Sequence, residues 1–245
     1  NHYFYAMKQN EISDFYDEYV QRQIKTGANE RLISLYKRLL NGGLNADSRV
    51  LELGCGVGIF TKLLAKKVKN GIIEAVDLSE KSVAVAKNEL KDRNNIHFDV
   101  ADVVKYQPKN SDFDMITLMD VIEHIPLEHH AELFANLAKI ATEKTNILIN
   151  IPNPQYIGYV RINHPESLQV IDQEVELFTL MQHLEKNGLE LAYFEKYGIW
   201  EQDDYHFMVI RKKRNFELKH LSDQRNFSEK IFHKLTTKID AVKYK

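Results

Sequence analysis

The residues best suited to chemistry are a glycine-rich turn and three carboxylates spaced around it. Residues 50–58 read VLELGCGVG, so an apolar run that contains Glu52 leads into a turn with glycine at every second position. Asp77 comes 19 residues after the last of these glycines, and Asp102 follows a third apolar run. Glycines let a backbone approach a ligand closely, and carboxylates accept hydrogen bonds from ribose hydroxyls or an adenine amine. Together these residues predict a nucleotide site.

Short apolar runs alternate with helical periodicity between residues 45 and 212, and these elements must position the carboxylates. The pattern predicts strands at 49–53, 72–76, 96–100, 115–119, 146–151, 189–195 and 206–211, and helices at 59–67, 82–92, 127–141 and 175–187. Such alternation is typical of a parallel sheet covered on both faces, in which ligands bind at the carboxyl ends of the strands. The short connection at 196–205 predicts that the last two strands form an antiparallel hairpin.

Length and composition fit one α/β domain with added terminal segments. The 245 residues are 44% apolar and 28% charged, which excludes a disordered chain, a collagen-like repeat and a disulfide scaffold. We expect an N-terminal helical lid at 1–44 and a core at 45–212, which contains a substrate-side insertion at 152–174. A basic amphipathic helical extension is expected at 213–245.

The single cysteine, Cys55, forbids an internal disulfide and fits a reducing compartment, so we expect a cytoplasmic protein. No stretch approaches the ~18 uncharged apolar residues that a membrane span needs. Near residue 1 no basic segment precedes an apolar core, so no signal peptide is expected.

The spacing E-x-G-x-G-x-G at 52–58 resembles the first motif of class I S-adenosylmethionine-dependent methyltransferases. It differs from the dinucleotide motif G-x-G-x-x-G because residue 59 is Ile. Residues 119–125, MDVIEHI, resemble the D-x-x-E-H segment of a small-molecule subgroup that includes ubiquinone-biosynthesis and sugar methyltransferases. The resemblance covers about residues 45–212. It implies a seven-stranded, mostly parallel Rossmann-like sheet with an antiparallel final hairpin, and S-adenosylmethionine as the cofactor.

The same resemblance assigns roles to the residues around the turn. It places Glu52 near the methionine end of the cofactor, Asp77 on the ribose and Asp102 on the adenine. The implied cofactor-binding residues are Glu52, Gly54, Cys55, Gly56, Gly58, Asp77, Leu78, Ala101, Asp102, Val103, Met119 and Asp120.

His124 is the candidate catalytic base. Methyl transfer is an in-line displacement, and a hydroxyl acceptor usually needs a base whereas an amine needs only to be deprotonated. His124 follows the fourth predicted strand, at the rim of the cofactor cleft, and histidine titrates near neutral pH. The competing interpretation is structural, in which His124 caps the next helix or orients a backbone carbonyl.

Other chemistries are predicted to be absent. His129 and His130 are adjacent, lack H-E-x-x-H spacing and predict a solvated helix start, so no metal site is expected. The segment 153–156, NPQY, follows the fifth strand and predicts a turn at the cleft rim. Because Cys55 lies inside the cofactor turn, covalent cysteine catalysis is not expected.

The acceptor should contact segments outside the core. Tyr16, Tyr19 and Arg22 of the predicted lid, with Tyr156 and Arg161 of the insertion, are the candidate acceptor-binding residues. Aromatic rings beside hydrogen-bonding groups suit a polar ring such as a sugar, a sugar nucleotide or a quinone-like metabolite. The competing interpretation is that these are core-facing or surface side chains. Trp200 either stacks on the acceptor or covers the sheet edge.

The basic end of the chain is the compositional anomaly. Residues 211–245 hold 11 Lys and Arg against 4 Asp and Glu, whereas the whole chain has a net charge of −2. An apolar helical stripe within this segment needs a partner surface, and it comprises Phe227, Ile231, Phe232, Leu235, Ile239 and Val242. Docking on the same chain or in a homodimer, binding of an anionic partner, and a mobile tail all stay open, although nucleic acid is not the favoured partner.

The sequence therefore predicts methyl transfer from S-adenosylmethionine to an oxygen or nitrogen of a small molecule. Two alternatives stay open. One is an RNA-modifying methyltransferase that uses the basic segment. The other is a non-catalytic regulatory protein that binds the cofactor.

Overall fold

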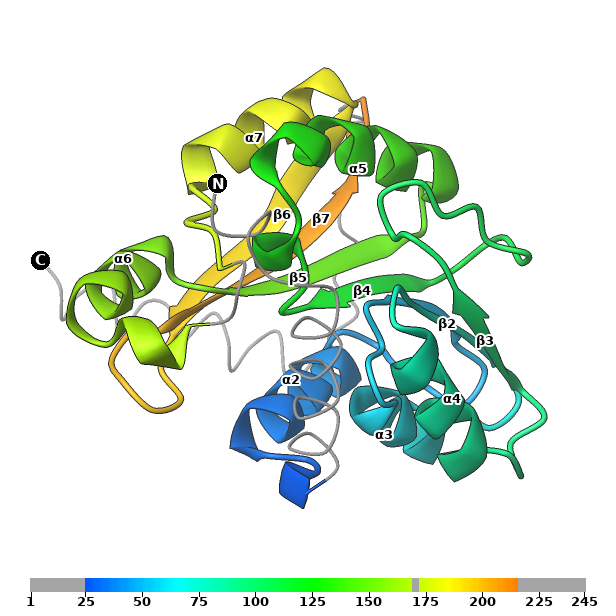
Figure 1. The fold of residues 1–245 in the computed structure, drawn as a ribbon. Helices are drawn as coiled ribbons and strands as arrows, with labels where there is room; N and C mark the ends of the chain where they lie inside the picture. The colour runs from blue at the N-terminus through cyan, green and yellow to red at the C-terminus, as the bar shows by residue number, and fades with distance from the viewer. Residues whose placement is uncertain (1–24, 169–171, 216–245) are drawn as a thin grey trace, which may run out of the picture. The chain divides into compact units, whose positions relative to one another are not determined.

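A seven-stranded mixed sheet organises the chain, of which the computed structural model describes residues 25–168 and 172–215 (Figure 1). The strand order is β3-β2-β1-β4-β5-β7-β6, with β7 antiparallel to both of its neighbours and the other pairs parallel. The strands are β1 (Arg49–Leu53), β2 (Ile72–Asp77), β3 (Ile96–Val100), β4 (Met115–Met119), β5 (Asn146–Pro152), β6 (Leu189–Tyr197) and β7 (Tyr205–Lys212). The predicted fold class is confirmed.

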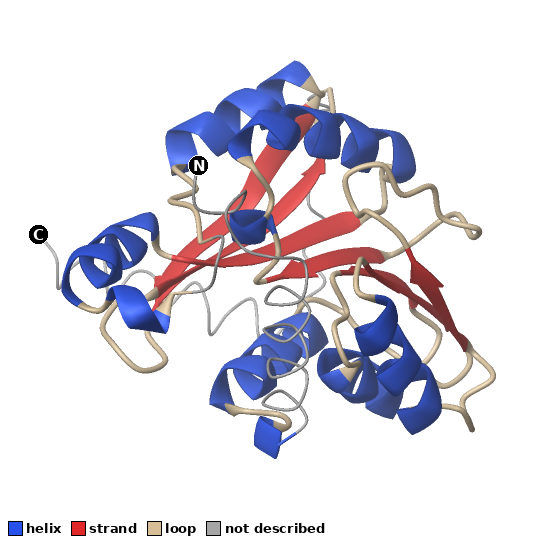
Figure 2. Cartoon of the chain, in the orientation of Figure 1, coloured by secondary structure: helices blue, strands red, loops and turns tan. Residues whose placement is uncertain are grey.

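Helices cover both faces of the sheet (Figures 1 and 2). On one face lie α5 (Leu127–Ile140) and α7 (Leu177–Lys186), and on the other lie α2 (Glu30–Asn41), α3 (Ile59–Lys67) and α4 (Glu80–Glu89). Each face has its own apolar core, with Phe134 and Leu180 in one and Leu39 and Leu64 in the other. This burial explains why β1, β4 and β5 read as nearly continuous apolar runs.

The insertion after β5 contains a helix. Residues Pro154–Asn163 form α6, and a 3₁₀ turn, η3, follows at Pro165–Ser167. The Asn153 side chain accepts a hydrogen bond from the Gln155 amide, and Pro154 occupies the first turn. The prediction of a turn at 153–156 was wrong, because Asn153 and Pro154 are a helix cap and a helix start.

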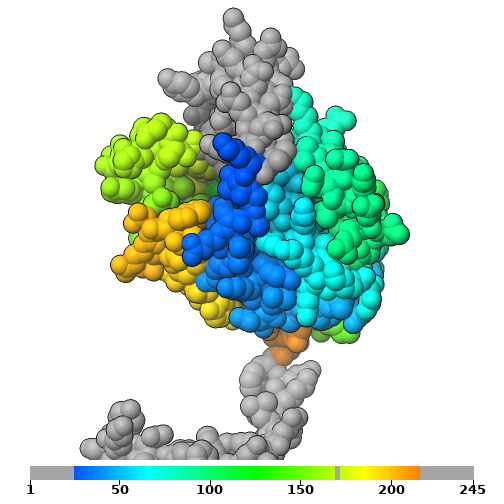
Figure 3. All heavy atoms as spheres, turned by 90° about the horizontal axis from the view of Figure 1, so that it is seen from below, coloured from blue at the N-terminus to red at the C-terminus, as the bar shows by residue number. Residues whose placement is uncertain are grey.

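Helix α2 is fastened to the β6–β7 hairpin by arginine. The Arg38 guanidinium donates to both carboxylate oxygens of Glu195, at 3.0 and 2.8 Å, and lies 3.9 Å from the centre of the Tyr197 ring. Figure 3 shows α2, in blue, between the orange hairpin and the cyan α3 region. The same helix presents Arg31 to the carboxyl ends of the strands, which brings a residue from before the core into the candidate site.

Several predictions lie outside the described residues. They concern the first part of the predicted lid, with Tyr16, Tyr19 and Arg22, and most of the extension at 213–245 with its apolar stripe. The described residues up to 213 belong to one compact unit. No helix in the described part of the chain is long and apolar enough to cross a membrane.

Candidate functional site

A large cavity lies at the carboxyl ends of β1, β2 and β4 and has a volume of about 1120 Å³. The predicted site residues that line it are Glu52, Gly54, Cys55, Gly56, Asp77, Leu78, Asp102, Val103, Met119, Asp120, His124 and Tyr156. Gly58, Ala101 and Arg161 do not line it. We call the part formed by Glu52, the turn at 54–58 and Asp77 the glycine-turn end. The part formed by Arg31, Asp120, Glu123, His124 and Asp172 is the His124 end.

The turn after β1 is built from backbone contacts. The amides of Gly54 and Cys55 both donate to the Val76 carbonyl, at 2.8 and 3.0 Å, which ties the turn to the end of β2. Gly54 has a φ of 82°, and a Cβ atom there would collide with the side chain of Val121. Only glycine meets both demands, so the residue type follows from the backbone path.

Asp77 holds the glycine-turn end from the neighbouring strand. Its Oδ2 accepts from the Gly56 amide at 2.8 Å, and its Oδ1 accepts from the Ser79 amide at 2.9 Å, just before α4 begins. A carboxylate oxygen has more than one lone pair, so both oxygens can accept a further hydrogen bond. Asp77 therefore fixes the turn and still offers acceptors to the cavity.

Glu52 is a buried carboxyl in the cavity wall. Its side chain is 3% exposed, and burial is the main cause that raises its pKa to about 8, with the nearby Thr61 hydroxyl opposing the rise and the charge of Asp77 adding to it. Its Oε2 has no hydrogen-bond partner within the described residues. A buried oxygen without a partner is costly, so this carboxyl favours a ligand that donates a hydrogen bond or carries positive charge.

Asp120 anchors the His124 end. It has a φ of 57°, a conformation that Asp tolerates better than most residues. Its Oδ1 accepts from the Asn150 side chain at 2.6 Å, and its Oδ2 lies 3.1 Å from Nε of Arg31. Arg31 also donates to the Tyr205 hydroxyl at 3.1 Å. The cavity wall here joins β4, β5, β7 and α2.

His124 lies in a short 3₁₀ turn, η2 (Ile122–His124), and faces two acids. Its Nδ1 is 3.1 Å from Oδ1 of Asp172, whereas its Nε2 is 4.0 Å from Oε1 of Glu123. Glu123 is 1% exposed, and burial is the main cause that raises its pKa to about 8, with Asp120 and Asp172 adding to the rise and His124 opposing it. Its Oε2 has no hydrogen-bond partner among the residues described.

His130 departs from its prediction. Its side chain is 2% exposed, and its Nε2 lies 2.9 and 3.0 Å from the carbonyls of Ile122 and Ile125. Burial lowers its pKa, so the neutral ring is favoured. The prediction of a solvated histidine was wrong for His130, which holds η2 in place, whereas His129 is exposed at the cavity.

Family comparison identifies the chain. The family described as "Methyltransferase domain" matches residues 16–227. The chain belongs to this family. It is an S-adenosylmethionine-dependent methyltransferase, as the resemblance of its glycine-turn motif implied.

Named relatives are similar over different shares of their length. The malonyl-[acyl-carrier protein] O-methyltransferase 1 of Ilyobacter polytropus is 28% identical over 227 residues, which cover 90% of this chain and 80% of the relative. A ubiquinone biosynthesis O-methyltransferase of Coxiella burnetii is 37% identical over 78 residues, 31% of this chain and 32% of the relative. The magnesium protoporphyrin IX methyltransferase of Synechocystis PCC 6803 has a similar fold, with a TM-score of 0.60 at 20% identity, covering 79% of this chain and 87% of that one.

Two acceptor candidates of the methyltransferase are placed differently. Tyr156 lines the cavity, whereas Arg161 does not. Nε of Arg161 lies 3.3 Å from Oε1 of Glu174 instead. Trp200 is 55% exposed, packs edge-on to Tyr205 and lies 5.8 Å from the Arg31 guanidinium. No comparison tests these roles, and the assignments to cofactor and acceptor stay predictions.

Sequence reasoning missed Asp172, which belongs to the segment before α7 and meets His124 from 48 residues away. No local pattern marks it, because an isolated acid in a polar insertion is most often a surface residue. Within residues 25–168 and 172–215, no group of three or more His, Cys, Asp and Glu side chains could hold a metal ion.

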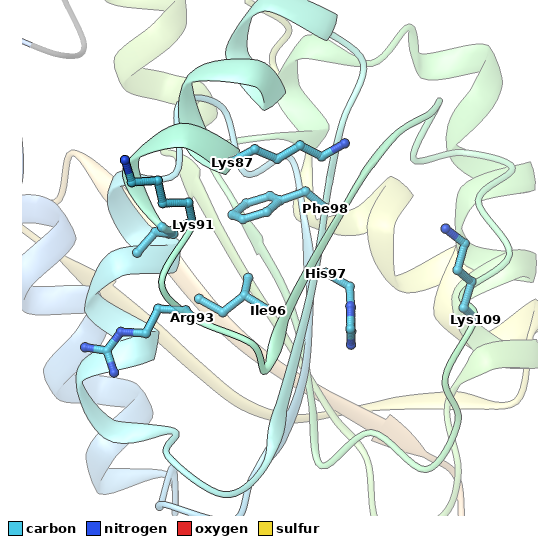
Figure 4. A pocket seen from close by; sticks show the side chains of 8 residues that line it. Lys87, Lys91, Arg93, Ile96, His97, Phe98 and Lys109 are labelled. Atoms are coloured by element: carbon cyan, nitrogen blue, oxygen red, sulfur yellow. The ribbon is translucent and has the colours of Figure 1, made fainter.

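A smaller hollow of about 270 Å³ lies between α4 and the start of β3, at the opposite edge of the strands from the glycine turn (Figure 4). Lys87, Lys91, Arg93 and Lys109 surround it, and Lys109 pairs with Asp99 at 2.6 Å. The hollow shares no lining residue with the larger cavity, so it is separate from the candidate site.

Proposed function

We propose that this methyltransferase transfers a methyl group to a hydroxyl oxygen of a small-molecule acceptor, with His124 as the general base. The observation that carries the proposal is the contact between Nδ1 of His124 and Asp172 in the wall of the cavity that also contains the glycine turn. An oriented imidazole beside a cofactor site is the arrangement that a hydroxyl acceptor requires.

The glycine-turn end fits the cofactor. Glu52 offers a buried oxygen without a described partner to a cationic or donating group, and Asp77 offers acceptors to hydroxyls. The absence of a Cβ at Gly54 keeps the backbone close to the cavity. We assign the methionine part to Glu52, the ribose to Asp77 and the adenine to Asp102. When bound, S-adenosylmethionine supplies a methyl group on a sulfonium centre, which leaves as a neutral thioether.

At the His124 end, Asp172 determines which nitrogen carries the proton. Its carboxylate accepts the Nδ1–H, so Nε2 is the nitrogen of the neutral ring that can take up a proton. As the new C–O bond forms, the hydroxyl proton moves to Nε2, and the charge of the imidazolium is balanced by Asp172. Arg31 pairs with Asp120 and donates to the Tyr205 hydroxyl, and these two contacts keep the rest of the wall at this end in place.

A carboxylate acceptor is the second candidate. Arg31 lines the cavity and could face an anionic acceptor, and the relative from Ilyobacter polytropus is named as an O-methyltransferase of a malonyl group on a carrier protein. A carboxylate is already ionised at neutral pH and needs no base. The two candidates therefore differ in whether His124 is required.

The test is His124→Gln, assayed as S-adenosylhomocysteine formed with pooled sugars, sugar nucleotides and phenols, with a pool of carboxylic acids, and with total RNA. General-base catalysis contributes ~10²–10⁴-fold, and turnover with the hydroxyl pool should fall by that amount while calorimetric cofactor affinity stays the same. The matched control is His97→Gln, since His97 is exposed on β3. Unchanged turnover of His124→Gln on carboxylic acids would favour the second candidate, and transfer to RNA alone would reject both.

A further inference from the structure

The segment Asp172–Glu174 supplies the partner of His124 although it belongs to the insertion. The Asp172 side chain is 10% exposed, and its Oδ1 is 3.1 Å from the His124 ring. No helix or strand fixes this segment, which precedes α7. Something else must hold its backbone if one carboxylate oxygen is to stay within hydrogen-bond distance of one ring nitrogen.

Gln173 fastens the segment on both sides of His124. Its backbone amide donates to the Glu123 carbonyl at 2.9 Å, and its side-chain amide donates to the Ile125 carbonyl at 2.9 Å. The carbonyls immediately before and after His124 are thus bonded to the residue immediately after Asp172. This pairing sets the position of the Asp172 backbone relative to the ring.

Arg161 of α6 also contacts the segment Asp172–Glu174. Its Nη2 donates to the Asp172 carbonyl, and its Nε is 3.3 Å from Oε1 of Glu174. The arginine therefore contacts the residues on either side of Gln173. Its planar guanidinium can satisfy both acceptors at once, which a lysine ammonium does less well.

These contacts suit positioning better than folding. The side chains of Arg161 and Glu174 are 48% and 43% exposed, and ion pairs this open to solvent add little to stability. Arg161 does not line the cavity, so it does not reach an acceptor in this arrangement. Its contacts converge instead on the backbone that carries Asp172.

We infer that Arg161 and Gln173 are positioning residues that hold Asp172 against His124 and thereby keep the proton of the neutral imidazole on Nδ1. This inference rests on the proposed function, because it concerns the same histidine. It replaces acceptor binding as the role of Arg161. A substitution of Arg161, which does not line the cavity, is then expected to change the tautomer of His124.

The test measures the tautomer of His124 by ¹⁵N NMR of the full-length protein at a pH where imidazoles are neutral. The chain has 10 histidines, so the His124 signal is assigned by its loss in His124→Gln. The wild type should show the Nδ1–H form as the dominant tautomer. The population of the Nδ1–H tautomer should fall in Asp172→Ala, Arg161→Gln and Gln173→Ala. In Arg161→Lys that population should lie between those of Arg161→Gln and the wild type.

The matched control is Glu166→Gln, which removes the pairing of Glu166 with His164 at 3.7 Å in the same insertion. Its tautomer should equal that of the wild type. The inference is overturned if Arg161→Gln and Gln173→Ala, both folded by circular dichroism, leave the tautomer unchanged, or if Asp172→Ala does. With an accepted hydroxyl substrate, misplacement of the base should lower turnover by up to ~10²-fold. Unaffected turnover of His124→Gln would reject the proposed function, whereas the tautomer measurement would still decide the positioning.

Discussion

The glycine-turn end and the His124 end of the cavity are held together in different ways. At the glycine-turn end, the close packing of Gly54 and the amides bonded to Val76 and Asp77 come from consecutive strand ends. At the His124 end, side chains from α2, η2 and the segment before α7 meet across the chain. Backbone contacts hold the glycine-turn end in one conformation that few substitutions can alter. Each side-chain contact at the His124 end can be changed by a single substitution. The first end is therefore suited to an invariant ligand and the second to a variable one.

The largest expected effect is at the glycine-turn end. Gly54→Ala should destabilise the fold by about 2–5 kcal/mol, because a left-handed φ costs ~1–2 kcal/mol and overpacking against Val121 costs ~1–3 kcal/mol. Denaturant unfolding measures it. The control is Gly43→Ala, whose φ is 102° with nothing within 4 Å of the added Cβ. Equal losses in the two variants would show that close packing at Gly54 is unimportant.

Asp77→Asn should weaken cofactor affinity by about 10–100-fold. The amide loses the charge that strengthens the hydrogen bonds from Gly56 and Ser79, each worth ~1.5–3 kcal/mol to a charged group. Calorimetry with S-adenosylhomocysteine measures the change, and Asp112→Asn, at an exposed loop residue, is the control. Affinity that survives the substitution would remove Asp77 from the cofactor site.

The buried carboxyls of Glu52 and Glu123 should each contribute a loss of stability as pH rises between about 4.5 and 8. Burial raises the pKa of Glu52 and of Glu123 from 4.5 to about 8, so in this window the unfolded chain has lost protons that the folded chain retains. Each group contributes a slope of at most ~1.4 kcal/mol per pH unit. Glu52→Gln and Glu123→Gln should each flatten the curve. Saturating cofactor should remove the Glu52 contribution alone, and equal responses of the two would contradict the division of the cavity.

The smallest effect is expected for Trp200→Ala, which removes an aromatic contact with Tyr205 and a cation–π contact with Arg31. Such contacts are worth ~0.5–1 kcal/mol at an exposed site. Thermal unfolding should shift slightly while turnover is retained. A large rise in KM with unchanged stability would instead place Trp200 on the acceptor.

The contiguous parts of the fold could be predicted from the sequence. The bounds of β1, β3, β4 and α3 match their predicted ranges. For β1, β4 and α3 the reason is that buried strands and a turn of alternating glycines leave unbroken local patterns. Glu52, Asp77 and Asp102 line the same cavity. This was predictable because the carboxyl ends of parallel strands lie at the same edge of a sheet. The glycine-turn end is encoded locally, residue by residue.

The His124 end could be predicted only in part. His124 could be identified from its sequence motif, but Asp172 could not. Which acid contacts His124 depends on the backbone path of the insertion, and no local pattern encodes that path. The burial of His130 depends on how α5 packs against η2, which the pattern of two adjacent histidines does not reveal. Helix α6 was the exception, since Asn153 and Pro154 were readable signals of a helix start.

The backbone at Asp120 limits how this enzyme can diversify. A φ of 57° admits Asp, Asn or Gly more readily than other residues. Asp120→Asn would keep that conformation and an oxygen for Asn150, while leaving the Arg31 cation without its counter-charge. A single nucleotide change in the gene could thus convert a charge-neutral Arg31–Asp120 pair in the cavity wall into an unpaired cation that attracts anions. The acceptor range of this scaffold can therefore change while Glu52, the glycine turn and Asp77 at the other end of the cavity stay as they are.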